Sequence, residues 1–106
     1  MTQAQLYQAL QSIGLPVAYH HFAAPPNPPY LVYLFSYSGD LMADDQNYVE
    51  ITNCQIELYT KKKDPATEKL VQDKLKELRL PYTETETFIE SESLFQALFL
   101  IQIIGG

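Results

Sequence analysis

The sequence predicts an α+β domain, with a mainly antiparallel sheet of four to five strands and two helices packed on one face. Two helical patterns and five strand-like stretches follow one another in the order α-β-β-β-α-β-β. Strands joined by short connections favour antiparallel pairing. The 106 residues, 46% of them apolar, suffice for one core, so we expect a single domain over residues 1–106.

The first two elements are a helix and a short strand. Thr2 and Gln5 form a weak capping box at the helix start, and apolar residues then recur at helical spacing. Gly14 ends the helix, because glycine readily adopts the left-handed conformation found at helix C-termini. A strand of roughly residues 17–22 follows.

Residues 23–29 form a proline-rich segment, Ala-Ala-Pro-Pro-Asn-Pro-Pro. Its four prolines lack backbone donors, so we expect a stiff, extended loop rather than regular structure. One interpretation is a simple connector. The other is a rigid arm, including Pro25 and Pro26, that contacts a neighbouring subunit.

Two strands and a polar loop occupy the middle of the chain. Residues 30–37 are aromatic and aliphatic on both faces, which predicts a strand. Residues 38–47 form a polar loop with an apolar tip at Leu41 and Met42. The next strand covers about residues 48–59, and alternation in its latter part predicts that only one face is buried.

A second helix and two further strands complete the domain. Asp64 is the expected N-cap, Pro65 is the expected first helical residue, and Pro81 ends the helix. The strand at about residues 82–90 alternates Thr with Glu before its apolar end. The strand at about residues 94–104 is apolar on both faces.

The charges are segregated along the chain, whose formal net charge is −6. All seven basic residues lie in residues 61–80, which also hold four acids and so carry a net charge of +3. Residues 1–60 contain five acids and residues 81–106 contain four glutamates, with no Lys or Arg. Because DNA-binding proteins need a broad basic surface, this pattern disfavours tight nucleic-acid binding.

Several classes of protein are excluded by simpler features. No apolar run reaches the roughly 20 residues of a membrane span, and the polar N-terminus lacks the pattern of a signal peptide. The single cysteine, Cys54, excludes an internal disulfide and a cysteine-based zinc site. These features suit an intracellular, soluble protein.

The histidines and the clustered aspartates give no metal site by their spacing. Neighbouring residues of a strand point to opposite faces, so we expect that His20 and His21 do not bind one metal ion together. Asp40, Asp44 and Asp45 resemble a calcium loop only loosely, because the central glycine and terminal glutamate of an EF-hand are missing. A solvated turn is the simpler interpretation.

The remaining motifs do not point to catalysis. The alternation of its strand places Cys54 on the face that points into the core, so it should behave as a small hydrophobic residue. The chain has no glycine-rich phosphate loop, no Gly-x-Ser-x-Gly elbow and no Cys-x-x-Cys. We therefore predict a non-enzymatic protein without catalytic, cofactor-binding or metal-binding residues.

The two apolar strands, at residues 30–37 and 94–104, have more apolar surface than two helices can cover. The helices cover one face of the sheet, so we expect an apolar patch on the other face that binds protein. The alternative is that loops of the same monomer cover it. Eight tyrosines and five phenylalanines fit an interface.

Two stretches of the sequence carry a resemblance to a known family. Residues 16–33 contain a strand, the proline-rich loop and then Pro-Tyr-Leu-Val-Tyr. Residues 43–64 contain Ala-Asp-Asp-Gln-Asn-Tyr, a strand, and Leu-Tyr-Thr-Lys-Lys-Lys-Asp before a helix. This pattern of short motifs covers nearly the whole chain. It resembles the small head–tail joining proteins of long-tailed bacteriophages and prophages, the tail-terminator or tail-completion group.

The resemblance implies a structural protein of the virion, found in the tail or neck and, during assembly, in the host cytoplasm. Members of this group have an α+β fold and form a ring, commonly a hexamer. The ring caps the tail tube and joins it to the head connector, and DNA passes through its lumen without specific binding. The expected partners are the protein itself, tail-tube protein and connector protein, with no cofactor and no membrane.

We expect the contacts of such a ring in the basic block, the acidic strand, the two loops and the spare apolar face. The candidate interface residues are Lys61, Lys62, Lys63, Arg79, Glu84, Glu86, Pro25, Pro26, Leu41, Met42, Leu98 and Leu100. Two other interpretations stay open. One is a cytosolic interaction module that uses the same sheet face, and the other is a small hydrolase or isomerase that uses Asp44, Asp45 or a histidine.

Overall fold

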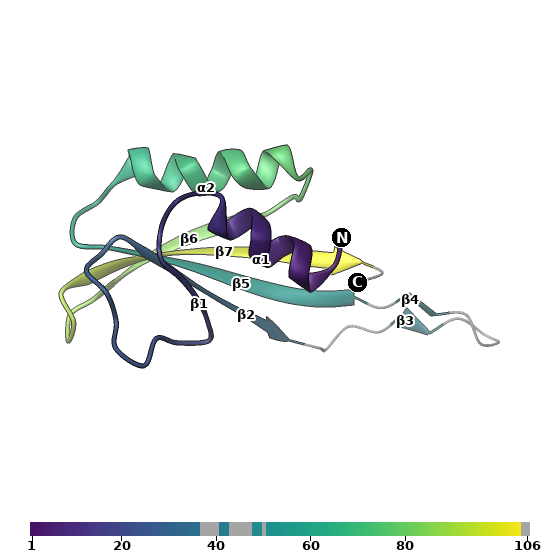
Figure 1. Cartoon of the computed structure of the whole chain (residues 1–106), viewed down its shortest axis with the longest axis horizontal. Helices are drawn as coiled ribbons and strands as arrows, with labels where there is room; N and C mark the ends of the chain where they lie inside the picture. The colour runs from purple at the N-terminus through teal and green to yellow at the C-terminus, as the bar shows by residue number, and fades with distance from the viewer. Residues whose placement is uncertain (37–40, 43–47, 50, 105–106) are drawn as a thin grey trace.

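The main sheet and its two helices follow the predicted order α-β-β-β-α-β-β, which confirms the α+β class (Figure 1). The computed structural model describes residues 1–36, 41–42, 48–49 and 51–104. The elements of the main body are α1 (Gln3–Gln11), β1 (Val17–Tyr19), β2 (Tyr30–Ser36), β5 (Ile51–Thr60), α2 (Pro65–Glu77), β6 (Thr83–Ile89) and β7 (Leu94–Ile104). A separate pair, β3 (Leu41–Met42) and β4 (Tyr48–Val49), lies beyond one end of this sheet (Figure 1).

The five strands lie in the order β1-β2-β5-β7-β6, and the last four pair antiparallel as predicted. β1 departs from the expected antiparallel pairing, because it runs parallel to β2 with Val17 opposite Leu31. A parallel neighbour needs a connection that returns the chain to the starting end of the sheet. Residues 20–29, which include the proline-rich segment, make that return.

Both helices pack on the same face of the sheet and bury one core against it. Leu6 and Leu10 of α1, Val71 and Leu75 of α2, and Phe99 of β7 all have no exposed surface. Burying an aliphatic or aromatic side chain of this size stabilises a fold by roughly 1.5–3 kcal/mol. These leucines, the valine and Phe99 thus hold both helices on the sheet, whereas Leu70 of α2 is 47% exposed.

Both predicted helix starts are confirmed. The backbone N–H of Gln5 donates to Thr2 Oγ1 at 3.1 Å, and the backbone N–H of Thr2 donates to Gln5 Oε1 at 2.8 Å, which completes the capping box. At α2, the Thr67 backbone N–H donates to Asp64 Oδ1 at 3.1 Å, and the Thr67 hydroxyl donates to Asp64 Oδ2 at 2.7 Å. These bonds satisfy donors that helix geometry leaves unpaired.

The second helix ends at Glu77, earlier than the proline at position 81 suggests. Arg79 adopts a left-handed conformation with φ of 58°, and the Leu80 backbone N–H donates to the Leu75 carbonyl at 2.9 Å. A left-handed residue after the last turn is a common helix ending. Gly or Asn usually fills this position, so the sequence did not mark the end here.

Two strand boundaries also differ from the prediction. β1 ends at Tyr19 rather than near residue 22, because His20 has φ of 70° and leaves the extended conformation. Within the stretch expected as loop 38–47, residues 41–42 form β3, which pairs antiparallel with β4. The expected strand 48–59 is therefore two strands in different sheets, β4 and β5.

β6 lies at one edge of the main sheet, and no strand in the described part of the chain pairs with its outer side. Its glutamates, Glu84 and Glu86, lie opposite the core residues Phe99 and Ala97 of β7 and share their face. Its threonines therefore occupy the other face. The opposite edge is the three-residue strand β1.

Candidate interaction surface

The face of the sheet opposite the helices is the candidate interaction surface. Cys54, Ile56 and Leu58 of β5 are buried on the helix side, as their alternation predicts, so their neighbours point the other way. We call this side the open face. On the three central strands it comprises Tyr30, Val32, Leu34 and Ser36 of β2, Asn53, Gln55, Glu57 and Tyr59 of β5, and Leu94, Gln96, Leu98, Leu100, Gln102 and Ile104 of β7.

The proline-rich return covers one end of the open face. The ring of Phe22 meets the ring of Tyr30 edge-on at 5.3 Å, and Tyr30 stacks on Tyr59 at 5.0 Å. Tyr30 is consequently only 7% exposed, and its neighbour on this face, Val32, is 5% exposed, although both point away from the helices. At this end the alternative interpretation is confirmed, since the monomer covers its own apolar surface.

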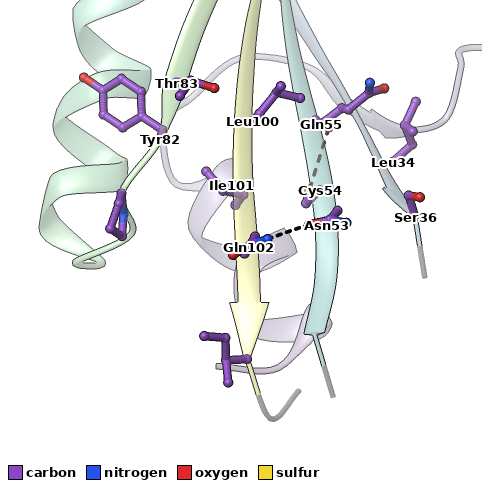
Figure 2. Close-up of a pocket in the computed structure, with 12 residues that line it drawn as sticks. Leu34, Ser36, Asn53, Cys54, Gln55, Tyr82, Thr83, Leu100, Ile101 and Gln102 are labelled. Carbon is purple, nitrogen blue, oxygen red and sulfur yellow. Dashed lines mark hydrogen bonds between the residues drawn. The ribbon is translucent and has the colours of Figure 1, made fainter. Parts of the chain in front are cut away.

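The other end of the open face is not covered by any described residue. A hollow of about 870 Å³ lies there, and its lining includes Leu34, Gln55 and Leu100 on three adjacent strands (Figure 2). Leu100 is 41% exposed and Ile104 is 60% exposed. None of the twelve described residues that line the hollow is charged. An uncharged, partly apolar surface of this kind suits contact with another protein surface.

Polar side chains on the open face are paired with one another across β5 and β7. Gln102 Nε2 donates to Asn53 Oδ1 at 3.1 Å beside the hollow (Figure 2). Toward the covered end, Gln96 Nε2 donates to the Tyr59 hydroxyl at 2.9 Å, and that hydroxyl donates to Glu57 Oε1 at 2.8 Å. Burial, reinforced by the hydrogen bond to Glu57, raises the pKa of Tyr59 to about 12. This tyrosine therefore stays protonated and serves as a hydrogen-bonding group.

The basic block and the acidic strand, far apart in sequence, meet where α2 crosses β6. Lys63 Nζ donates to Glu68 Oε1 at 3.0 Å and also pairs with Glu86. Gln72 Nε2 donates to Glu84 Oε1 at 2.8 Å. Burial raises the pKa of Glu84, and the neighbouring Glu68 adds to the effect. Lys63 and Glu86 thus have partners within the chain.

The other predicted interface residues are distributed over several surfaces. Leu100 lines the hollow, and Leu98 is half-buried beside it on the same strand. Pro25, Pro26 and Lys61 line a second hollow of about 400 Å³ at the proline-rich return. Lys62 and Arg79 are exposed, before and after α2 respectively. Leu98 and Leu100 therefore lie close together on one strand, whereas the exposed cations Lys62 and Arg79 lie elsewhere on the surface.

Some predicted residues fall outside the described part of the chain. Asp40, Asp44 and Asp45 are among them, so the interpretation of a solvated turn stays a prediction. Leu41 and Met42 form β3, whose backbone pairing is described, but their side chains are not. Their proposed contact role likewise stays a prediction.

The hollow is also lined by residues outside the predicted interface set. Leu34, Gln55, Gln102 and Ile104 line it together with Leu100. Their two-residue alternation on three strands was visible in the sequence. What the sequence did not show is which end of the face the proline-rich return would cover.

The expectation that the two histidines point apart is wrong. His20 lies outside the strand and has φ of 70°, so the alternation of a strand does not apply to it. Its Nδ1 atom lies 3.2 Å from Nδ1 of His21, and the rings are nearly perpendicular at 87°. Both side chains are exposed.

Cys54 behaves as the sequence predicts. Its thiol is 1% exposed, and burial raises its pKa to about 12. Over residues 1–36 and 51–104, no three His, Cys, Asp or Glu side chains gather as metal ligands. Neither α1 nor α2, the helices of the described chain, is long and apolar enough to span a membrane.

Comparison with known proteins does not assign the chain to a family. No protein-family model matches it, and no curated protein sequence matches it.

Proposed function

We propose that the protein is a virion assembly protein of a long-tailed phage or prophage, which forms a ring at the head–tail junction. The ring would terminate the tail tube and join it to the head connector. The observation that carries the proposal is the uncovered end of the open face, where Leu100 and Ile104 are exposed beside an uncharged hollow. The motif pattern of the sequence supports the identity of the assembly.

The arrangement of surfaces favours contacts between unlike patches of neighbouring subunits. The open face is mostly uncharged, whereas Lys62 and Arg79 are exposed on the far side of the molecule, around α2. A contact between two different patches generates a ring when its rotation closes. An apolar patch at the centre of such a contact, with charged residues at its rim, is the usual anatomy of a protein interface.

The proposal predicts that the exposed end of the open face is needed for assembly. We expect Leu100→Ser with Ile104→Ser to abolish ring formation, because both side chains would be buried by the partner. Tyr19→Ser is the matched control, since Tyr19 is also exposed, at 48%, but lies on the edge strand β1, outside both patches. Native mass spectrometry and sedimentation, with the protein alone and mixed with tail-tube protein, give the readout.

Two outcomes would count against the proposal. A protein that stays monomeric and never binds tube or connector protein contradicts it, whereas a monomer that assembles only on the tube does not. Normal assembly by the double variant would exclude this face as the contact. Electron microscopy of particles that lack the protein tests the role itself, with overlong tails or tails detached from heads as the expected result.

A further inference from the structure

The turn that follows β1 brings the two histidines together. The His21 backbone N–H donates to the Tyr19 carbonyl at 2.8 Å across a single residue, His20, whose φ is 70°. A hydrogen bond between residues two apart defines a γ-turn, and the form with positive φ at its centre is rare and strained. The His20 N–H donates to the Tyr33 carbonyl at 2.8 Å, which anchors the turn to β2.

The identity of the central residue is informative. Glycine adopts positive φ without steric cost, and asparagine tolerates it better than most residues. A turn needed only to reverse the chain would be more stable with either of them. The position instead carries His20, followed directly by His21, and these are the two histidines of the whole chain. Strained backbone at such a position is typical of functional sites.

The distance between the imidazole nitrogens fits a metal chelate. The two Nδ1 atoms are 3.2 Å apart and share one hydrogen bond, so the donor ring must carry its proton on Nε2 instead when both Nδ1 atoms bind an ion. Histidine nitrogens bind zinc at about 2.0–2.1 Å, so one ion bound by both would have an N–metal–N angle of about 100°. This angle lies close to the tetrahedral value. Because both rings are exposed, they can rotate until both lone pairs point at the ion.

We propose that His20 and His21 form a two-nitrogen site for a divalent transition-metal ion of the zinc class. Imidazole ligands suit zinc, copper and nickel rather than calcium or magnesium. Water completes the coordination, since no third His, Cys, Asp or Glu of the described residues joins the pair. The site is independent of the role in phage assembly.

Zinc chloride titrated into the full-length protein tests the proposal. The chain has two histidines, so NMR should show two imidazole signals. We expect both to shift together and to saturate at one zinc ion per chain, with calorimetry giving the affinity. Loss of one nitrogen removes the chelate, so His20→Asn and His21→Gln should each weaken binding roughly tenfold or more.

The choice of variants separates ligand loss from misfolding. Asparagine at position 20 tolerates the positive φ, and His20→Gly relieves the strain while removing the nitrogen. We expect His20→Gly to unfold at higher urea concentration than the unsubstituted protein and still to lose zinc binding. The variant that combines His20→Asn with His21→Gln measures any zinc binding elsewhere on the chain. A double variant with unchanged zinc affinity, or zinc that shifts only one imidazole signal, would overturn the proposal.

Discussion

Cys54 illustrates how its surroundings can remove the reactivity of a single residue. The thiolate is the nucleophilic form of cysteine. Burial raises the pKa of Cys54 from 9.0 to about 12, and the side chain is 1% exposed. The residue therefore contributes as a small core side chain next to Ile56 and Leu58 on the same strand face.

We expect Cys54 to resist thiol reagents in the folded protein. A pKa rise from 9.0 to about 12 lowers the thiolate fraction near pH 8 by about a thousandfold. Labelling with a chromogenic disulfide at pH 8 should therefore be slow, and its rate should rise with urea through the unfolding transition. Labelling of the folded protein as fast as of the unfolded chain would contradict this expectation.

Glu84 is the residue whose charge opposes folding. Its pKa is raised above the ordinary 4.5 by burial and by Glu68. A carboxyl group with a raised native pKa favours folding when protonated. That contribution is complete below pH 4.5 and is lost as the pH rises through the native pKa.

Glu84→Gln should therefore stabilise the protein near pH 7. The amide oxygen can still accept the hydrogen bond from Gln72, and the repulsion from Glu68 is removed. Because Glu84 is partly hydrated, we expect a gain of about 0.5 kcal/mol, disappearing toward pH 4.5. Urea denaturation of both proteins across this pH range gives the measurement. Glu90→Gln, at an exposed position after β6, is the control and should change little.

At the scale of elements, strand β7 has one face that contributes to stability and another that is available for interaction, because its side chains alternate between the core and the open face. Phe99 points into the core with no exposed surface, whereas its neighbour Leu100 is 41% exposed on the open face. The two residues are adjacent in sequence and differ only in the face they occupy. Their substitutions should therefore have different consequences.

We expect Phe99→Ala to lower the free energy of unfolding by about 3–5 kcal/mol, because it leaves a cavity under both helices. Leu100→Ala should cost less than about 1 kcal/mol, since the side chain is partly solvated in the monomer. Chemical denaturation of the two monomeric variants checks the difference. Equal losses would mean that the faces of β7 are wrongly assigned.

The elements also show where sequence reasoning succeeds and where it stops. The alternation of β5 and the caps at Thr2 and Asp64 were predictable, because they depend on residues close together in sequence. The parallel pairing of β1 was not, because it depends on the path of the proline-rich return. Nor was the meeting of His20 and His21, which follows from one positive φ at a residue type that rarely adopts it.

For the candidate site, the sequence predicted an uncovered apolar face but not its extent. The strands predicted at residues 30–37 and 94–104 had apolar residues on both faces, so the face opposite the helices also had to be covered. Where Phe22 and Tyr30 meet, the chain provides that layer itself. Within the described part of the chain, the end near Leu100 and Ile104 is left uncovered, and this depends on contacts between segments distant in sequence.

At the scale of the whole molecule, folding changes the meaning of the charge pattern. The +3 block of residues 61–80 and the acidic strand are separate in sequence, but Lys63 joins them through Glu68 and Glu86. Part of the apparent complementarity between subunits is thus satisfied inside one subunit. Of the cations predicted to lie at the interface, Lys61, Lys62 and Arg79 are exposed and remain candidates for contacts between subunits.

We expect assembly to weaken as ionic strength rises, because contacts between exposed charges are screened by salt. Lys61→Gln with Lys62→Gln should weaken the assembly and flatten its salt dependence, while leaving the stability of the monomer nearly unchanged. Sedimentation at several sodium chloride concentrations measures both effects. Assembly that is insensitive to salt in the unsubstituted protein would remove these lysines from the interface.

The edge strand β6 has a consequence for the solubility of the chain. An unpaired edge is a template on which a second sheet can grow, and such growth leads to fibrils. Two β6 strands paired antiparallel would bring the carboxylates of Glu84 and Glu86 from each copy onto one face. Like charges opposite one another oppose pairing. Glu84, whose charge weakens the fold at neutral pH, and Glu86 thus keep the sheet from extending itself indefinitely.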